Sequence, residues 1–138
     1  MQVLIVPNGI EHDGAGFDKV VKLSELDSLS QSVTVLEINN ILDTVPNRDE
    51  LLKVLLSKLR YGGRIILNGT DIDNVTQALV SRAINIEEAS QRLYDGRMSC
   101  SSANAMIEKL TSFGIKITKV KFNQFDYMIV AERSKPNG

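Results

Sequence analysis

Short runs of apolar, β-branched residues alternate along the chain with longer stretches of helical periodicity. The run 3–6 (Val-Leu-Ile-Val) is apolar throughout and ends in the turn signal Pro7-Asn8-Gly9, which predicts a short buried strand. The run 33–38 (Val-Thr-Val-Leu-Glu-Ile) predicts a second buried strand, because β-branched residues fit a pleated surface. A further strand is predicted over 64–67, ending at Asn68-Gly69.

The stretch between the first two of these strands has weaker signals. Residues 10–16 contain two glycines and several polar groups, and are predicted to form a loop. Residues 17–23 have the composition of a short strand, and residues 24–32 that of a turn with one helical turn.

Leucines at helical spacing predict a helix after residue 46. They fall on one face, with Asn47 as the expected N-cap and Gly62-Gly63 as the expected stop. The leucines concerned are Leu51, Leu52, Leu55, Leu56 and Leu59. Further helices are predicted over 71–84, 86–94 and 103–113, the last of them capped by Ser101 or Ser102.

The C-terminal region predicts a β-hairpin. Residues 116–122 and 127–133 have strand composition and a short join, so we expect them to pair antiparallel. A strand, a helix of about twelve residues and another strand form a right-handed βαβ unit, which implies a parallel sheet covered on both faces. The sequence therefore predicts an α/β fold with a doubly wound, mostly parallel sheet and a C-terminal antiparallel hairpin. Residues 1–133 are expected to form a single domain and residues 134–138 a disordered tail.

Composition narrows the classes of function. The chain has 138 residues, of which 43% are hydrophobic, and a net charge of −1, which argues against binding nucleic acid or anionic membranes through bulk charge. A single cysteine and a single histidine exclude a disulfide framework within the chain, a multi-cysteine metal site and a His-rich zinc site, so no metal site is expected. The first residues lack the basic region of a signal peptide and the length of a membrane span, so we expect a cytoplasmic protein.

Three stretches together resemble class I S-adenosylmethionine-dependent methyltransferases, which are Rossmann-like. These are residues 35–45, residues 49–59, and the sequence Leu-Arg-Tyr-Gly-Gly-Arg-Ile-Ile-Leu at 59–67. In that family a fourth strand is followed by a leucine-rich helix, a Leu-Lys-Pro-Gly-Gly turn and a fifth strand. Residues 98–133 are similar to the last helix and closing strands of the family. The resemblance covers roughly residues 17–133 and implies S-adenosylmethionine as a small-molecule cofactor.

The N-terminal part departs from this family. The resemblance implies a Gly-rich loop after the first strand and an acidic residue at the end of the second, which hold the methionine end and the ribose of the cofactor. Here Val6-Pro7-Asn8-Gly9 has no Gly-x-Gly spacing, and Gly14-Ala15-Gly16 comes about eight residues too late. Only 26 residues, 7–32, precede the strand at 33, about half of what a complete set of elements needs. We therefore expect a fold reduced at the N-terminus, with the first helix and the second strand missing or shortened.

Candidate cofactor contacts follow from the resemblance and from the rule that open α/β sheets bind ligands at the carboxyl ends of their strands. They are Pro7, Asn8, Gly9, Ile38, Asn39 and Asn40. The alternative for the two asparagines after residue 38 is that they only satisfy backbone groups in a turn.

The candidates for acid–base chemistry are few. His12 lies between Glu11 and Asp13 and could serve as a general base, although adjacent loop residues rarely converge on one point. Asp43 aligns with an acid common in the family, or is a surface residue before Pro46.

Polar residues also follow the strand at 64–67. Asn68, Gly69 and Asp71 lie where the resemblance implies substrate contacts, and Asp71 is equally a helix cap. Cys100 has no partner in sequence and is expected to be a packed thiol. A mild basic excess in the C-terminal half is expected to be a solvated face rather than a nucleic-acid site; it comprises Arg92, Arg97, Lys109, Lys116, Lys119 and Lys121.

Two main hypotheses remain. The first is a small methyltransferase-like protein with an unknown acceptor, in which a homo-oligomer could complete the shortened pocket. The second is a non-catalytic module that keeps the fold for interaction or assembly, of the trimmed kind that viruses encode. A third, by analogy alone, is an accessory partner of nucleic-acid- or sugar-modifying enzymes.

Overall fold

The computed structural model describes residues 1–7 and 16–135. The N-terminal elements are β1 (Gln2–Val6), β2 (Lys19–Lys22), a 3-10 helix η1 (Leu23–Ser28), β3 (Val33–Asn39), a 3-10 helix η2 (Leu42–Thr44) and α1 (Arg48–Lys58). The later elements are β4 (Leu59–Thr70), α2 (Ile72–Val80), α3 (Ile86–Tyr94), α4 (Ala103–Ser112), β5 (Ile115–Asn123) and β6 (Asp126–Arg133).

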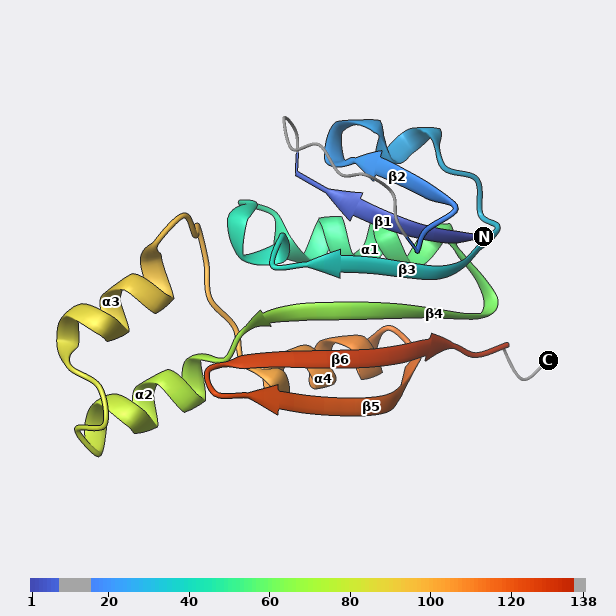
Figure 1. Ribbon diagram of the computed structural model, residues 1–138. Coiled ribbons are helices and arrows are strands. Elements are labelled where there is room, and N and C mark those ends of the chain that lie inside the picture. The colour runs from blue at the N-terminus through green and yellow to red at the C-terminus, as the bar shows by residue number, and fades with distance from the viewer. Residues whose placement is uncertain (8–15, 136–138) are drawn as a thin grey trace.

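The strands form one six-stranded sheet in the order β2-β1-β3-β4-β6-β5 (Figure 1). β1 pairs in parallel with β2 and β3, and β3 pairs in parallel with β4. β6 runs antiparallel to β4 and to β5, so the predicted hairpin closes one side of the sheet. The predicted α/β fold with a mostly parallel sheet is confirmed. The second strand is present but short, as one of the two expected alternatives: Lys19–Lys22 has only four residues and occupies the edge beside β1.

The core lies on one face of this sheet. Alternate residues of the strands point towards α1 and α4, which both lie behind the sheet in Figure 1. The fully buried members include Leu36, Ile38, Ile65, Leu67 and Ile129 from the strands and Leu52, Leu55 and Leu110 from the helices. Among the described residues, α-helices cover this face alone. The connection from β2 to β3 supplies only η1, and no described α-helix lies on the near face.

The helix α1 ends earlier than its glycines predict. It stops at Lys58, and Leu59 already pairs with Val33 at the start of β4. The register then jumps from Leu59 to Arg64 opposite β3, so the intervening residues bulge out of the ladder. Gly62 has a φ of 81°, and a Cβ on Gly63 would lie 2.9 Å from the carbonyl oxygen of Val33. The two glycines are therefore needed by a bulge within a strand rather than by a helix end.

The remaining helices follow the prediction closely. α2 and α3 project from the carboxyl-terminal end of the parallel strands and share a small cluster around Val75, Ile84 and Ala89, apart from the main core (Figure 1). The Ser102 hydroxyl accepts a hydrogen bond from the backbone N–H of Ala105, which confirms the predicted cap of α4. Asn47 precedes α1 but makes no capping hydrogen bond with its side chain. No helix in the described part of the chain is long and apolar enough to cross a membrane.

Because one layer of helices carries the whole main core, truncating α1 should be costly. Leu55→Ala removes a fully buried side chain and should lower the free energy of unfolding by roughly 2–5 kcal/mol. Val54→Ala, at the neighbouring position with 37% of the residue exposed, is the matched control and should cost well under half as much. Urea denaturation followed by circular dichroism measures both, and equal losses would contradict a core on this face.

Candidate functional site

Three asparagines lie at the carboxyl-terminal ends of β3 and β4. Asn39 and Asn68 are opposite each other in the register, and the Asn68 side-chain amide donates a hydrogen bond to the Asn39 side-chain oxygen. The backbone N–H of Asn40 donates to the carbonyl oxygen of Asn68 at 3.2 Å. Asn40 has a φ of 58°, a left-handed conformation that asparagine tolerates better than most residues. The turn thus leaves the Asn40 side chain exposed at the end of the sheet.

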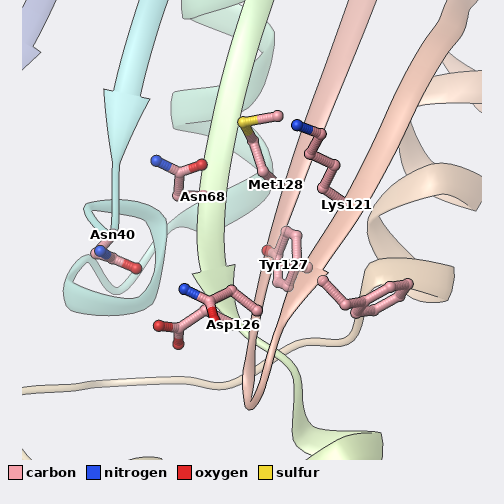
Figure 2. Close-up of a pocket in the computed structure, with 8 residues that line it drawn as sticks. Asn40, Asn68, Lys121, Asp126, Tyr127 and Met128 are labelled. Atoms are coloured by element: carbon pink, nitrogen blue, oxygen red, sulfur yellow. The ribbon is translucent and has the colours of Figure 1, made fainter.

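A pocket of about 320 Å³ adjoins these asparagines (Figure 2). Its lining comes from the ends of β3 and β4 and from the β5–β6 hairpin, and comprises Asn40, Asn68, Lys121, Phe122, Asn123, Asp126, Tyr127 and Met128. It combines amides, one cation and one carboxylate with apolar groups. Its volume is at the lower end of the roughly 300–1,000 Å³ typical of small-molecule sites.

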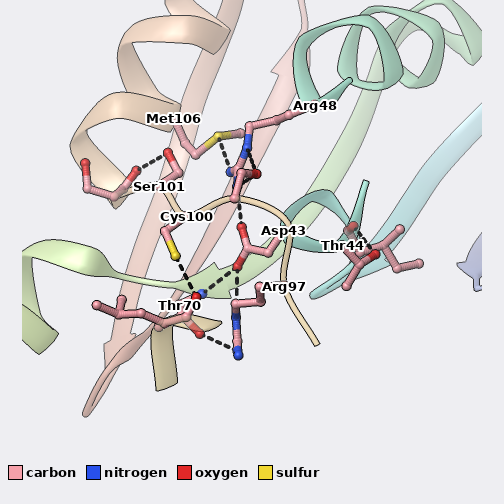
Figure 3. Close-up of polar contacts among 12 residues, drawn as sticks. Asp43, Thr44, Arg48, Thr70, Arg97, Cys100, Ser101 and Met106 are labelled. Carbon is pink, nitrogen blue, oxygen red and sulfur yellow. Dashed lines mark hydrogen bonds and ion pairs between the residues drawn. The ribbon is translucent and has the colours of Figure 1, made fainter. Parts of the chain in front are cut away.

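Asp43 organises a polar cluster beneath this surface (Figure 3). Its carboxylate is 2.6 Å from Nη2 of Arg48 and 3.5 Å from Nε of Arg97, while Asp43 itself is only 2% exposed. Its backbone carbonyl accepts hydrogen bonds from the N–H groups of Met98 and Ser99, at 2.7 and 3.1 Å. The side chain and backbone of one residue therefore hold the segment before α4 against the end of β3.

The two arginines extend the cluster to other elements. Arg48 donates to the Ser99 hydroxyl at 2.8 Å, and Arg97 donates to the Thr70 hydroxyl at 2.7 Å (Figure 3). Thr70 ends β4, and its backbone N–H lies 3.4 Å from the Asp43 carboxylate. The ends of β3 and β4, the start of α1 and the segment before α4 are thus joined through one charged centre.

The predicted acids have structural partners. Asp43 is not the surface residue that one alternative allowed, since it is buried and paired with both arginines. Asp71 is 3% exposed, and its carboxylate accepts a hydrogen bond from the backbone N–H of Ala103 at 3.0 Å. Asp71 sits at the N-cap position of α2 without capping it, and binds the first turn of α4 instead.

Tyr127 forms the floor of the pocket next to Gly69. It is 2% exposed, and burial together with the nearby Asp43 carboxylate raises the pKa of its phenol, against the opposing effect of Arg48. A Cβ on Gly69 would lie 2.6 Å from the Tyr127 hydroxyl oxygen, so the absence of a side chain at 69 allows the ring to reach the cluster.

The other predicted site residues are not found in the pocket or in the Asp43 cluster, or lie outside the described residues. Ile38 points into the core and can offer a ligand only its backbone, and Pro7 follows the end of β1. Asn8, Gly9, Glu11, His12 and Asp13 lie outside the described residues, so their predicted roles stay predictions. No group of three or more potential metal ligands occurs in the part of the chain that the structure describes.

Cys100 packs as expected for a structural thiol. Its Sγ lies 2.9 Å from the Leu93 carbonyl oxygen, and burial, with the Asp43 carboxylate, raises its pKa above the ordinary value.

The basic residues of the C-terminal half do not form one patch. Arg97 joins the Asp43 cluster, Arg92 stacks on the Phe125 ring at 4.4 Å, and Lys109 pairs with Asp49. Lys116, Lys119 and Lys121 are exposed along β5. The expected solvated face is therefore limited to this strand.

Sequence reasoning missed Arg48, Asp126 and Lys121 as members of the cluster and the pocket. Arg48 opens α1 directly after the Asp43 segment, which was a signal for a local ion pair. Asp126 and Lys121 belong to the two strands of one hairpin, and the hairpin register could have placed them at the same end of the sheet.

One implied cofactor contact has the wrong chemistry. The resemblance implies an acid at the end of the second strand, but β2 ends at the exposed Lys22. The nearest acid along the chain is Glu25, which is exposed within η1.

The overall fold is that of class I methyltransferases. Solved structures that superpose on the chain include the plantazolicin methyltransferase BpumL in complex with a triazolic desmethylPZN analog and SAH (13% identity, TM-score 0.61, covering 96% of this chain and 67% of that one). Another is from a complex between the Haloferax volcanii Trm112 methyltransferase activator and a methyltransferase. It has 11% identity and a TM-score of 0.60, and the match covers 87% of this chain and 63% of that one. A third is an S-adenosylmethionine dependent methyltransferase from Mesorhizobium loti. It has 13% identity and a TM-score of 0.58, and the match covers 86% of this chain and 72% of that one.

The chain spans only part of the length of these structures. It spans 63% of the Haloferax chain and 36% of an O-methyltransferase family protein from Burkholderia thailandensis. At the level of sequence, no family model and no curated protein matches it. The likeness is therefore one of fold.

Removing the charge at the centre of the cluster should destabilise the protein. Asp43→Asn leaves the mostly buried Arg48 and Arg97 without their counter-charge, and should lower the free energy of unfolding by about 3 kcal/mol or more. Asp49→Asn is the matched control, because it breaks an ion pair whose two side chains are 54% and 40% exposed and should cost less than about 1 kcal/mol. Equal losses in urea denaturation at neutral pH would show that the cluster does not hold these elements together.

Ionisation of Tyr127 should lower the free energy of unfolding at alkaline pH. Because its pKa is raised in the folded state, the neutral phenol favours folding below about pH 10, and that contribution declines as the pH rises further. The stability difference between the wild type and Tyr127→Phe should therefore change by up to about 1.4 kcal/mol per pH unit above pH 10. Denaturation at a series of pH values measures it, and curves that stay parallel would contradict a buried phenol.

Proposed function

We propose that this protein binds S-adenosylmethionine at the carboxyl-terminal ends of β1, β3 and β4 and acts as a small methyltransferase. The observation that carries the proposal is the exposed asparagine turn at the end of β3, next to a pocket, in a sheet of the class I methyltransferase order. Open α/β sheets place their ligands at this end of the strands. We further infer that it acts in the cytoplasm, where a single reduced cysteine is compatible with the composition.

The residues at this end fit the cofactor in part. Asn39 and Asn40 are exposed, and each amide offers both donors and an acceptor, as the polar edges of a nucleoside require. Lys22 does not fit, because an ammonium group cannot accept hydrogen bonds from ribose hydroxyls. We therefore assign the asparagines, rather than β2, as the contacts that hold the nucleoside.

The pocket lies where an acceptor can be held. When bound, the cofactor supplies an electrophilic methyl group, so the protein contributes mainly positioning and exclusion of water. Asp126 is exposed in the pocket and 3.4 Å from the Thr70 hydroxyl, and its carboxylate can receive a proton from an acceptor hydroxyl or amine. Lys121, on the opposite wall, can orient an anionic group of the acceptor.

A non-catalytic module with the same fold is the second candidate. Lys22 at the end of β2 and the sheet face left uncovered by described helices favour it. The two candidates differ in whether the protein binds the cofactor.

Calorimetric titration with S-adenosylmethionine and S-adenosylhomocysteine tests the proposal. We expect saturable binding and a rise in melting temperature at millimolar ligand, because binding to the folded state alone stabilises it. Asn39→Ala and Asn40→Gly should each weaken binding about tenfold or more, since leaving a buried polar group of the ligand without its partner costs about 1–3 kcal/mol. Glycine is chosen at position 40 because it keeps the left-handed backbone.

Asn104→Ala, at an exposed position on α4, is the control and should leave affinity unchanged. Absence of both heat and thermal shift in the wild-type protein would remove the methyltransferase proposal and leave the non-catalytic module. Binding that is indifferent to both asparagine substitutions would move the site away from the β3 turn.

A further inference from the structure

On the face of the sheet that carries no α-helix among the described residues, the side chains of β3 to β5 form a regular array. From β3 to β5, the strand register aligns them in three rows of four: Val35, Arg64, Glu132 and Lys116; Glu37, Ile66, Val130 and Lys119; Asn39, Asn68, Met128 and Lys121. We call these twelve residues the open face. Parallel sheets are normally covered on both sides, and β3 and β4 pair in parallel, so this part of the open face is one that a covering layer would suit.

The middle row has apolar residues at its centre and opposite charges at its two ends. Ile66 and Val130 are partly exposed at its centre, with Glu37 at the β3 end and Lys119 at the β5 end. Interaction with the side chain of the neighbouring Lys121 lowers the pKa of Lys119, as expected where two ammonium groups lie close together. An apolar centre flanked by opposite charges can bind a surface with the reverse arrangement.

We propose that the open face binds the open face of a second copy of this chain. A two-fold axis parallel to the strands, passing between β4 and β6, places β3 over β5 of the second copy and β4 over its β6. Each row then meets the same row read in the opposite direction. Such an isologous contact requires a self-complementary surface, which the first two rows provide.

This axis places opposite charges, or apolar groups, across the interface in the first two rows. Glu37 meets Lys119 of the second copy, and Ile66 meets its Val130. In the first row Arg64 meets Glu132 of the second copy. In the third row Asn68 meets Met128, so no like charges are opposed across the interface.

An axis perpendicular to the strands gives the opposite result. It keeps the middle row over itself, so that Glu37 faces Glu37 and Lys119 faces Lys119. Like charges brought together in this way oppose association. The charges therefore select the axis parallel to the strands, which matches the aligned packing of two sheets about 10 Å apart.

This arrangement also bears on the pocket. Asn68, Lys121 and Met128 belong to both the third row and the pocket lining. In the dimer the third row of the second copy covers this side of the pocket. The proposal does not rest on cofactor binding, because it follows from the sheet face alone.

Sedimentation equilibrium of the wild-type chain, over roughly 1 µM to 1 mM, is the first measurement. We expect a reversible monomer–dimer equilibrium. Glu37→Lys should weaken the dimer at least tenfold, because it places two ammonium groups opposite each other at both ends of the middle row. Lys119→Glu should do the same with carboxylates, and Lys119 is exposed enough that its replacement leaves folding intact.

The decisive experiment restores the opposite charges at positions 37 and 119. The double variant E37K/K119E should dimerise like the wild type, since both pairs are exchanged. An equimolar mixture of the two single variants should form a heterodimer, although each alone is monomeric. Glu108→Lys, which makes the same charge change at an exposed position of α4 on the far side of the sheet, should leave the dimer unaffected.

Three results would overturn the proposal. A wild-type chain that stays monomeric throughout the series has no such interface. A dimer that tolerates both single substitutions forms through another surface. Two single variants that are monomeric alone, and remain so when mixed, show that the two charges do not meet across a two-fold axis.

Discussion

Apolar contact between one face of the sheet and a single layer of two helices holds this molecule together. α1 and α4 pack side by side against the alternate residues of β1, β3, β4 and β6, and the fully buried side chains of the main core belong to that contact. The antiparallel hairpin extends the face on which the helices lie. The arrangement is half of a three-layer α/β fold, and the position of the pocket and the exposure of the other face follow from it.

At the carboxyl-terminal ends of the parallel strands, a cluster of charged residues around Asp43 adjoins the apolar layer. Asp43 meets two arginines from different elements and also holds Met98 and Ser99 through its backbone. Thr70 contacts Asp43, Arg97 and Asp126, so the cluster connects the end of β3 and the segment before α4 to the hairpin. The asparagine turn therefore adjoins a buried and well-connected cluster, which suits a site that positions its ligand.

Much of this structure could be read from the sequence, and the remainder depends on contacts between distant residues. Local patterns located the strands, the leucine-rich α1 and the cap at Ser102, because propensity and periodicity act over a few residues. The face on which helices lie is a property of the whole chain, and among the described residues α-helices lie on only one of the two faces. Arg97 reaches Asp43 only after the sheet is assembled, so no spacing in the sequence marks that pair.

The two outer strands show how the sheet ends. β2 is four residues long with Lys19 and Lys22 exposed, and β5 is interrupted by an irregularity between Ile117 and Lys119 and carries exposed lysines. Short edges, bulges and lysine side chains obstruct the docking of another strand onto free backbone groups. These features discourage continuous growth of the sheet from molecule to molecule at both margins, and so oppose fibrous aggregation of a protein whose described α-helices cover only one face of the sheet.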